Sequence, residues 1–171
     1  IKNFYLDKRR YNATILYGPP GTGKTTLALV SALETNSEIF ELNASDLRNK
    51  EKLESTLKPA IEQKPLNQEK QKKIILVDEV DGILGVDRGG LDELLDLIST
   101  TKYPIIITAD NIWDRKFSDL RKKAELIQLK EVDYKTIKDI LICILNREKL
   151  FVDEKILTSI AVNDRGDIRA A

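Results

Sequence analysis

Eight consecutive residues near the start of the chain have the types and spacing needed to bind a polyphosphate. Residues 18–25 read GPPGTGKT and match the pattern G-x-x-x-x-G-K-[ST]. An apolar, β-branched run at 13–17 precedes them and a helix-like segment follows, which is the context that the motif requires. The pattern predicts a phosphate-binding loop and disfavours a glycine-rich turn that carries Lys-Thr by coincidence.

Each residue type in this loop has a chemical reason. Gly18, Gly21 and Gly23 leave room for backbone N–H groups to approach phosphate oxygens, and the helix that begins near Gly23 adds the positive end of its dipole. Lys24 is expected to reach the β- and γ-phosphates, and the Thr25 hydroxyl is expected to hold Mg²⁺.

An acidic pair follows a second apolar run. Residues 74–77 are continuously apolar, as in a strand covered on both faces, and they end in Asp78 and Glu79. Asp78 can coordinate Mg²⁺ beside Thr25, and Glu79 can poise a water for in-line attack on the γ-phosphate. The alternative is an acidic strand end without a chemical role. The pattern favours nucleotide hydrolysis over small-molecule phosphotransfer, which needs no activated water.

Composition narrows the chemistry further. The 171 residues hold 28 basic and 28 acidic side chains, so net charge does not indicate a partner. One cysteine and no histidine exclude a disulfide within the chain, a histidine-ligated metal and a histidine base. No apolar run approaches ~20 residues and no secretory signal opens the chain. We therefore expect no membrane segment and a cytoplasmic protein, or a nuclear one in a eukaryote.

The order of predicted elements indicates an α/β fold. Strands are expected at 13–17, 38–43, 74–77, 104–108 and 125–129, and helices alternate with them, including one in which Leu91, Leu94, Leu95 and Ile98 form an apolar stripe. This alternation predicts a five-stranded parallel sheet flanked by helices over residues 1–130. Helices are also expected within 1–10 and after Asp46, and a surface loop over 65–73.

Residues 131–171 have only helical periodicity. The apolar residues of 137–145 and of 156–161 form two stripes, and Gly166 with Asp167 is typical of a helix stop and a new N-cap. Cys143 lies within the first apolar stretch and is expected to be a buried structural thiol. These residues predict the beginning of a second, all-helical subdomain, which is truncated because the chain is expected to be a fragment of a longer protein.

With both motifs placed, the chain resembles the AAA+ ATPases, and within them the clamp loaders. The resemblance rests on LYGPPGTGKTT at 16–26, ELNASD at 41–46, LVDEVDG at 76–82, DRGG at 87–90 and GDIR at 166–169. It implies a P-loop ATPase that uses ATP and Mg²⁺ to open a ring-shaped sliding clamp of the PCNA type and place it on primer–template DNA, within a hetero-oligomer. It also makes residues 131–171 the start of a lid subdomain.

The resemblance extends the list of candidate site residues. It implies nucleotide contacts from the entire loop, namely Gly18, Pro19, Pro20, Gly21, Thr22, Gly23, Lys24, Thr25 and Thr26. The family places a sensor residue, usually Asn, at the tip of the fourth strand, where this chain has Asp110 followed by Asn111, and either side chain can orient the water. A second sensor corresponds to Arg169. The implied catalytic set is therefore Glu79, Lys24, Asp110, Asn111 and Arg169.

Two further positions bear on partners. Small subunits of clamp loaders carry a Ser-Arg-Cys finger before the fifth strand, and this chain has Lys122, Lys123 and Ala124 there. The absence of this arginine is similar to the large subunits of clamp loaders. The resemblance implies that such a subunit receives an arginine finger from a neighbouring small subunit. Arg88, before a helix, is expected either to contact DNA phosphate or to serve only in a turn.

Two other functions remain open at this point. One is a different AAA+ remodeller, such as a helicase loader or a branch-migration motor. The other is a nucleotide-binding scaffold whose own ATPase is dispensable, which the unusual order of Asp110 and Asn111 favours.

Overall fold

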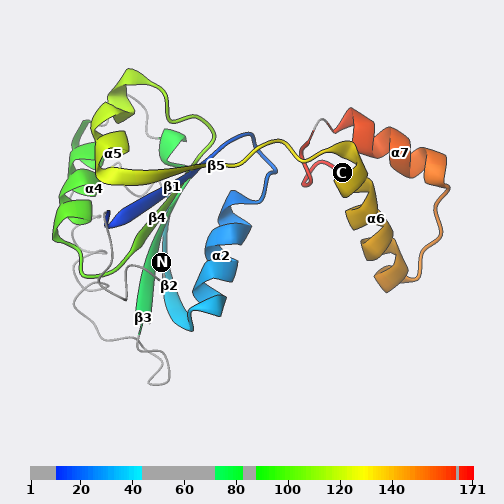
Figure 1. The fold of residues 1–171 in the computed structure, drawn as a ribbon, viewed down its shortest axis with the longest axis horizontal. Helices are drawn as coiled ribbons and strands as arrows, with labels where there is room; N and C mark the ends of the chain where they lie inside the picture. The colour runs from blue at the N-terminus through cyan, green and yellow to red at the C-terminus, as the bar shows by residue number, and fades with distance from the viewer. Residues whose placement is uncertain (1–10, 44–71, 83–87, 165) are drawn as a thin grey trace. The chain divides into compact units, whose positions relative to one another are not determined.

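The computed structural model describes residues 11–43, 72–82, 88–164 and 166–171. The chain divides into two compact units, one within residues 1–17 and 25–128 and the other within 18–24 and 129–171 (Figure 1). The predicted helix within 1–10, the helix after Asp46 and most of the predicted loop 65–73 lie outside the described residues.

The first unit is built on a five-stranded parallel sheet. Its strands are β1 (Ala13–Tyr17), β2 (Ser37–Asn43), β3 (Lys72–Asp78), β4 (Ile105–Ala109) and β5 (Ala124–Gln128). Their order in the sheet is β2-β3-β4-β1-β5, and every pair is parallel. The α/β fold class is thereby confirmed. Because all carboxyl ends meet at one edge, the residues that follow β3 and β4 lie near each other.

Four of the five strands differ in their bounds from those expected. The strand predicted at 38–43 begins one residue earlier, at Ser37. The strand predicted at 74–77 begins two residues earlier, because Lys72 and Lys73 pair with Ser37 and Glu38 of β2. The strand predicted at 104–108 begins after Pro104, which has no N–H to donate. The fifth strand runs one residue earlier than expected. The ends of a strand depend on its pairing with neighbouring strands. The periodicity of a single segment carries no information about that pairing.

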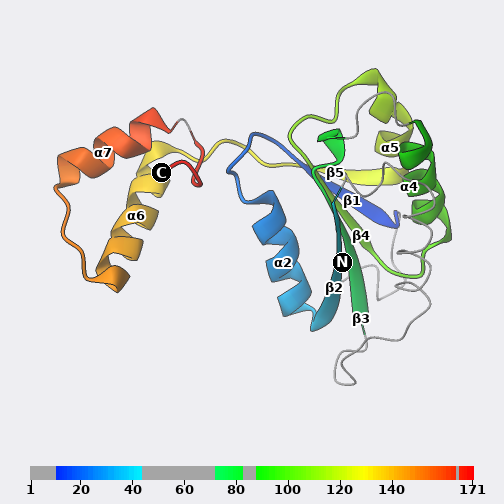
Figure 2. The same cartoon turned by 180° about the vertical axis from the view of Figure 1, so that it is seen from behind.

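Helices cover both faces of the sheet. Helix α2 (Lys24–Glu34) lies on one face, and α4 (Arg88–Thr100) and α5 (Ser118–Lys123) lie on the other (Figures 1 and 2). Short 3₁₀ turns, η2 (Val80–Gly82) and η3 (Arg115–Phe117), complete the described elements of this unit. The predicted stripe of α4 faces the core: Leu94 and Ile98 are buried, and Leu91 and Leu95 pack against the same cluster.

The second unit contains helices α6 (Tyr134–Glu148) and α7 (Glu154–Asn163). Ile137, Leu157 and Ala161 are buried. The expectation of a buried Cys143 is wrong, because this thiol is exposed. It lies six residues after Ile137, which is about 240° around an α-helix and so on a different face. Among the described residues, none of the helices has the length and apolar character needed to cross a membrane.

Helix α6 begins at a well-formed cap. The Asp133 carboxylate accepts hydrogen bonds from the backbone N–H groups of Lys135 (2.8 Å) and Thr136 (3.1 Å) and from the Thr136 hydroxyl (3.0 Å). The backbone and hydroxyl hydrogen bonds from Thr136 hold the pKa of Asp133 below its usual range. A lowered pKa means that the ionised cap stabilises the folded state at neutral pH and stops doing so as acid protonates it.

We therefore expect Asp133→Ala to lower the melting temperature of the full-length protein at pH 7. The gap to wild type should narrow as the pH falls below 3.8, the ordinary pKa of this group, and through its lowered folded-state value. Thermal melts followed by circular dichroism at a series of pH values measure this. Asp139→Ala, which removes an exposed carboxylate from the same helix, is the control. An Asp133→Ala deficit that stayed constant into strong acid would contradict the capping account.

Candidate active site

The first unit brings together the two residues predicted to hold a metal ion. The Thr25 hydroxyl, on the first turn of α2, donates to the Asp78 carboxylate at the end of β3, with Oγ1 to Oδ1 and Oδ2 distances of 3.0 and 3.2 Å. The side chains of Thr25 and Asp78 are both half-buried. Helix α2 and strand β3 thus bring two oxygen-bearing side chains, both potential metal ligands, into contact.

This donor set fits Mg²⁺. The ion prefers oxygen ligands and usually keeps several waters while it binds one or two protein groups and substrate phosphates. Within the part of the chain that the structure describes, no group of three or more His, Cys, Asp or Glu side chains is arranged to hold a metal on its own. Thr25 and Asp78 would therefore supply part of the coordination shell of a bound Mg²⁺.

Glu79 has an unusual backbone conformation. Its φ is +55°, in the left-handed region that costs a residue with a side chain about 1–2 kcal/mol. Its N–H donates to the Thr108 hydroxyl at 2.9 Å, and its carbonyl accepts from the N–H of Gly82 at the end of η2. The chain therefore leaves β3 abruptly at Glu79, and its carboxylate is exposed.

The two candidate sensor residues have different surroundings. The Asp110 N–H, directly after β4, donates to Asp81 Oδ2 at 2.9 Å, which ties the tip of β4 to the turn after β3. The Asn111 side-chain oxygen accepts from the Trp113 N–H at 2.9 Å, as in an Asx turn. The Asn111 amide oxygen is therefore bonded to its own loop, whereas Asp110 lies at the strand tip itself.

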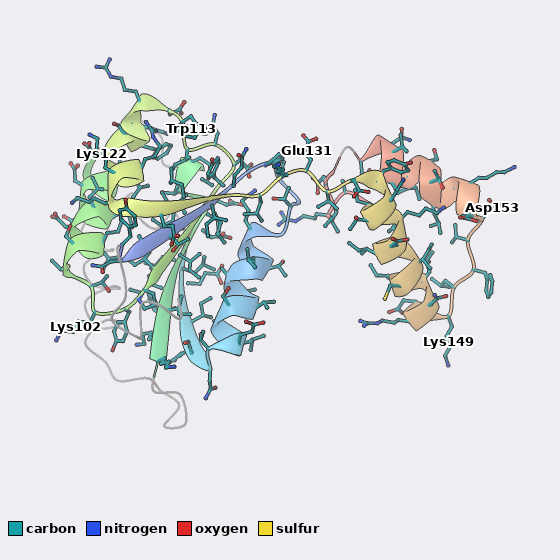
Figure 3. The ribbon with its side chains drawn as sticks, viewed as in Figure 1. Lys102, Trp113, Lys122, Glu131, Lys149 and Asp153 are labelled. Carbon is teal, nitrogen blue, oxygen red and sulfur yellow. The ribbon has the colours of Figure 1, made fainter. Side chains whose placement is uncertain are left out.

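The loop after β4 is held by an interaction that sequence reasoning missed. Arg121 of α5 donates to the carbonyls of Ile112 (2.6 Å) and Asp114 (2.9 Å), and its guanidinium lies 5.4 Å from the centre of the Trp113 ring. Trp113 in turn makes an edge-to-face contact with Tyr17, at 5.9 Å between ring centres. Figure 3 labels Trp113 beside this loop. No spacing rule predicts this contact, because its members come from three separate segments.

Residues 18–24 of the predicted phosphate loop belong to the second unit and are hydrogen-bonded to one another. The Lys24 ammonium donates to the carbonyl oxygens of Gly18 and Pro19, each at 2.8 Å, and the Thr22 hydroxyl donates to Pro19 O at 2.9 Å. Gly21 and Gly23 both have positive φ, +68° and +84°. The Lys24 side chain thus folds back over the loop.

The loop is joined to the turn that carries Arg169. The Ile168 N–H donates to Gly21 O at 3.2 Å, and the Asp167 carboxylate accepts from the N–H groups of Arg169 (2.8 Å) and Ala170 (3.2 Å). A Cβ on Gly21 would lie 1.7 Å from the Asp167 carboxylate oxygen, so only glycine fits. The predicted N-cap at Asp167 has the hydrogen bonds of a cap, although residues 166–171 form turns.

The predicted residues therefore fall into two groups. Thr25, Asp78 and Glu79 meet at the carboxyl edge of the sheet, with Asp110 tied to the same turn. The second group lies in the other unit: the loop with Lys24 at its end, bonded to the turn that carries the exposed Arg169. The chain itself joins the groups, because α2 begins at Lys24.

Arg88 and the residues before β5 are the positions that bear on partners. Arg88 is the first residue of α4, and its side chain lies outside the described atoms. In the clamp-loader resemblance, Lys122 and Lys123 stand where small subunits have the Ser and Arg of the finger, and the Lys123 ammonium donates to the Ser99 hydroxyl at 3.0 Å. Lys122 projects from α5 (Figure 3) and forms an ion pair with Asp119 at 2.8 Å. The lysine is exposed and bonded within its own helix.

Sequence comparison agrees with this geometry. Residues 14–139 match the ATPase family associated with various cellular activities (AAA). This range holds the phosphate loop, the acidic pair and the candidate sensor positions at the tip of β4. The chain therefore belongs to the AAA ATPase family.

Within that family, the chain is similar to replication factor C large subunits. It is 40% identical to the replication factor C large subunit of Thermofilum pendens over 100% of this chain and 41% of that protein. It is 40% identical to the one of Nanoarchaeum equitans over 98% of this chain and 39% of that protein. The large subunit of Methanococcus maripaludis (strain C7) is 36% identical over 98% of the chain. The chain thus spans about two-fifths of the length of the first two relatives.

The glycines of the loop give a direct test of its packing. We expect Gly21→Ala to destabilise the protein more than Gly23→Ala, which has nothing within 4 Å of its Cβ and should cost only about 1–2 kcal/mol for its left-handed backbone. Thermal unfolding of the full-length variants measures the difference, with Gly82→Ala, also open on its Cβ side, as control. Equal losses at Gly21 and Gly23 would contradict the contact with Asp167.

Proposed function

We propose that this chain is the ATP-hydrolysing part of the large subunit of a clamp loader, which opens a sliding clamp and loads it onto primer–template DNA. The observation that most supports the proposal is identity of about 40% to replication factor C large subunits over the full chain. The Thr25–Asp78 pair supports the ATPase part of it independently.

The proposed reaction is in-line hydrolysis of ATP. A water attacks the γ-phosphorus, the bond from that phosphorus to the β–γ bridging oxygen breaks, and Glu79 accepts the proton of the water. ADP and inorganic phosphate leave. Mg²⁺, held by Thr25 and Asp78, supplies charge neutralisation on the phosphate oxygens when it is bound.

The remaining loop residues bind rather than react. Lys24 exchanges the carbonyl oxygens of Gly18 and Pro19 for oxygens of the β- and γ-phosphates. The loop from Gly18 to Thr26 supplies backbone N–H groups to the same phosphates. Arg169 reaches the γ-phosphate from the lid, and the Ile168–Gly21 hydrogen bond supports this role because it links the arginine's turn to the loop.

Asp110 is the better candidate for the first sensor. It directly follows β4, and its N–H is fixed by Asp81, so it lies beside the acidic turn. The Asn111 side-chain oxygen is bonded to the N–H of Trp113, which favours a role in the loop. We propose that Asp110 orients the attacking water.

Glu79→Gln separates binding from hydrolysis. The substitution keeps the shape of the side chain and removes the base, so we expect kcat to fall by about 10²- to 10⁴-fold with ATP affinity retained. ATP turnover and nucleotide binding by the full-length protein with its partner subunits measure both. Glu125→Gln, which removes an exposed carboxylate from β5, is the control. A Glu79→Gln complex that loaded clamps normally would instead favour the scaffold function.

A partner must supply the transition-state arginine in this proposal. The residues before β5 are Lys122 and Lys123, and Lys123, which stands at the position of the finger arginine, donates to the Ser99 hydroxyl of α4 at 3.0 Å. An arginine finger is typically worth about 10³- to 10⁵-fold in rate. The proposal therefore includes a hetero-oligomer in which a small subunit faces the nucleotide of this chain.

We accordingly expect weak hydrolysis by the full-length protein alone and strong stimulation by small subunits. The assay mixes the protein with candidate small subunits, a PCNA-type clamp and primed DNA, and follows phosphate release. Small subunits whose Ser-Arg-Cys arginine is changed to Ala serve as control and should not stimulate. Full turnover by the isolated protein would contradict the assembly.

The same assay separates the clamp loader from other AAA+ remodellers. A helicase loader or branch-migration motor would not be stimulated by, or co-purify with, a sliding clamp. Arg88 begins α4, and a contact of this residue with DNA phosphate remains part of the proposal.

A further inference from the structure

A buried threonine lies between the two acidic residues of the site. Thr108 of β4 is only 1% exposed, and its hydroxyl has two partners. It donates to Asp78 Oδ1 at 2.5 Å and accepts from the Glu79 N–H at 2.9 Å. One oxygen atom therefore contacts both the carboxylate that is expected to hold the metal and the backbone of the expected base.

The sheet places this hydroxyl there. β3 and β4 pair in parallel with Val77 opposite Ile107, so the next residue of each strand, Asp78 and Thr108, occupy adjacent positions at the same edge. Side chains at adjacent positions of paired strands lie on the same face of a sheet. For this reason the side chain at position 108 can reach Asp78. No other residue of β4 lies opposite Asp78.

A hydroxyl performs both tasks with a single oxygen atom. It has one proton to donate to a carboxylate and lone pairs that accept an N–H, whereas a carboxylate at this position would accept only and an apolar side chain would do neither. The hydrogen bond to Asp78 is assisted by charge, which makes it stronger than a neutral one.

The second hydrogen bond acts on an unfavourable backbone. Glu79 has φ +55°, a conformation that persists only where surrounding contacts hold it. Its N–H bond to Thr108 and the hydrogen bond from the Gly82 N–H to its carbonyl are such contacts. Because the direction of the Glu79 carboxylate depends on this backbone, a change at Thr108 alters where the base points.

We infer that Thr108 is a positioning residue for ATP hydrolysis: its hydroxyl fixes the Asp78 carboxylate toward Thr25 and holds the Glu79 backbone so that the base faces the attacking water. The inference rests on the proposed function, and it assigns to Thr108 an effect on turnover and on Mg²⁺ use that exceeds its effect on ATP binding.

Thr108→Val tests this, because valine keeps the shape and removes both hydrogen bonds. In the full-length protein with its partner subunits, we expect kcat to fall by about 10- to 100-fold, since the hydrogen bond to a charged group and the aim of the base are lost together. ATP affinity should change little, and the Mg²⁺ concentration for half-maximal turnover should rise. Thr108→Ser restores the hydroxyl and should recover most of the lost rate.

A second buried threonine provides a matched control. Thr101 is 6% exposed, donates to Tyr103 O at 3.1 Å and accepts from the Tyr103 N–H at 3.0 Å, in the turn before β4. Thr101→Val removes the same two kinds of hydrogen bond away from the acidic pair. It should lower thermal stability without the selective loss of kcat.

The double variant Thr108→Val/Glu79→Gln adds an independent readout. At saturating Mg²⁺, which offsets the effect through Asp78, the double variant should turn over no more slowly than Glu79→Gln alone if Thr108 positions Glu79. Should Thr108→Val not fold, Thr108→Ala, which cannot clash, replaces it. Unchanged kcat in Thr108→Val, equal losses in Thr108→Val and Thr101→Val, or no recovery in Thr108→Ser would overturn the inference. A wild-type protein that bound no ATP would instead overturn the proposed function.

Discussion

The carboxylate of Asp78 is the point on which the rest of this site depends. It accepts hydrogen bonds from Thr25 of α2 and from Thr108 of β4, so a helix, two strands and the turn after β3 are fixed by one charged group. A carboxylate at the end of a buried strand is costly unless its oxygens are hydrogen-bonded. The two hydroxyls meet that requirement and also leave the group able to share an ion with phosphate oxygens.

In the second unit, the phosphate loop is likewise held by a few close contacts. Gly21 is packed so closely against Asp167 that no Cβ fits, and its carbonyl accepts the Ile168 N–H. A motif normally explained by phosphate binding alone therefore also has a reason within the protein. The loop and the turn of Arg169 are therefore joined directly, by one hydrogen bond and by close packing.

Much of this site was predictable from local patterns. The phosphate loop is a contiguous motif, and the run 74–77 ending in Asp78 and Glu79 needs only strand periodicity to place it. Three contributions were not predictable, because each depends on a contact between residues that are separated in the chain. Thr108 bonds to Glu79, 29 positions away, and Asp167 packs on Gly21, 146 positions away. Arg121 bonds to Ile112, 9 positions away. The burial of Cys143 was predicted wrongly because an apolar stretch does not say which face of the helix is covered.

The sequence by itself determined the alternation of strands and helices, the phosphate loop and the acidic pair, because each of these is written in consecutive residues whose periodicity or spacing has a direct physical meaning. The tertiary structure decided which strand lies beside which and in what register. That register puts Thr108 next to Asp78, so the hydrogen bonds that aim the acidic pair arise from pairing between strands, a relation that no single segment contains.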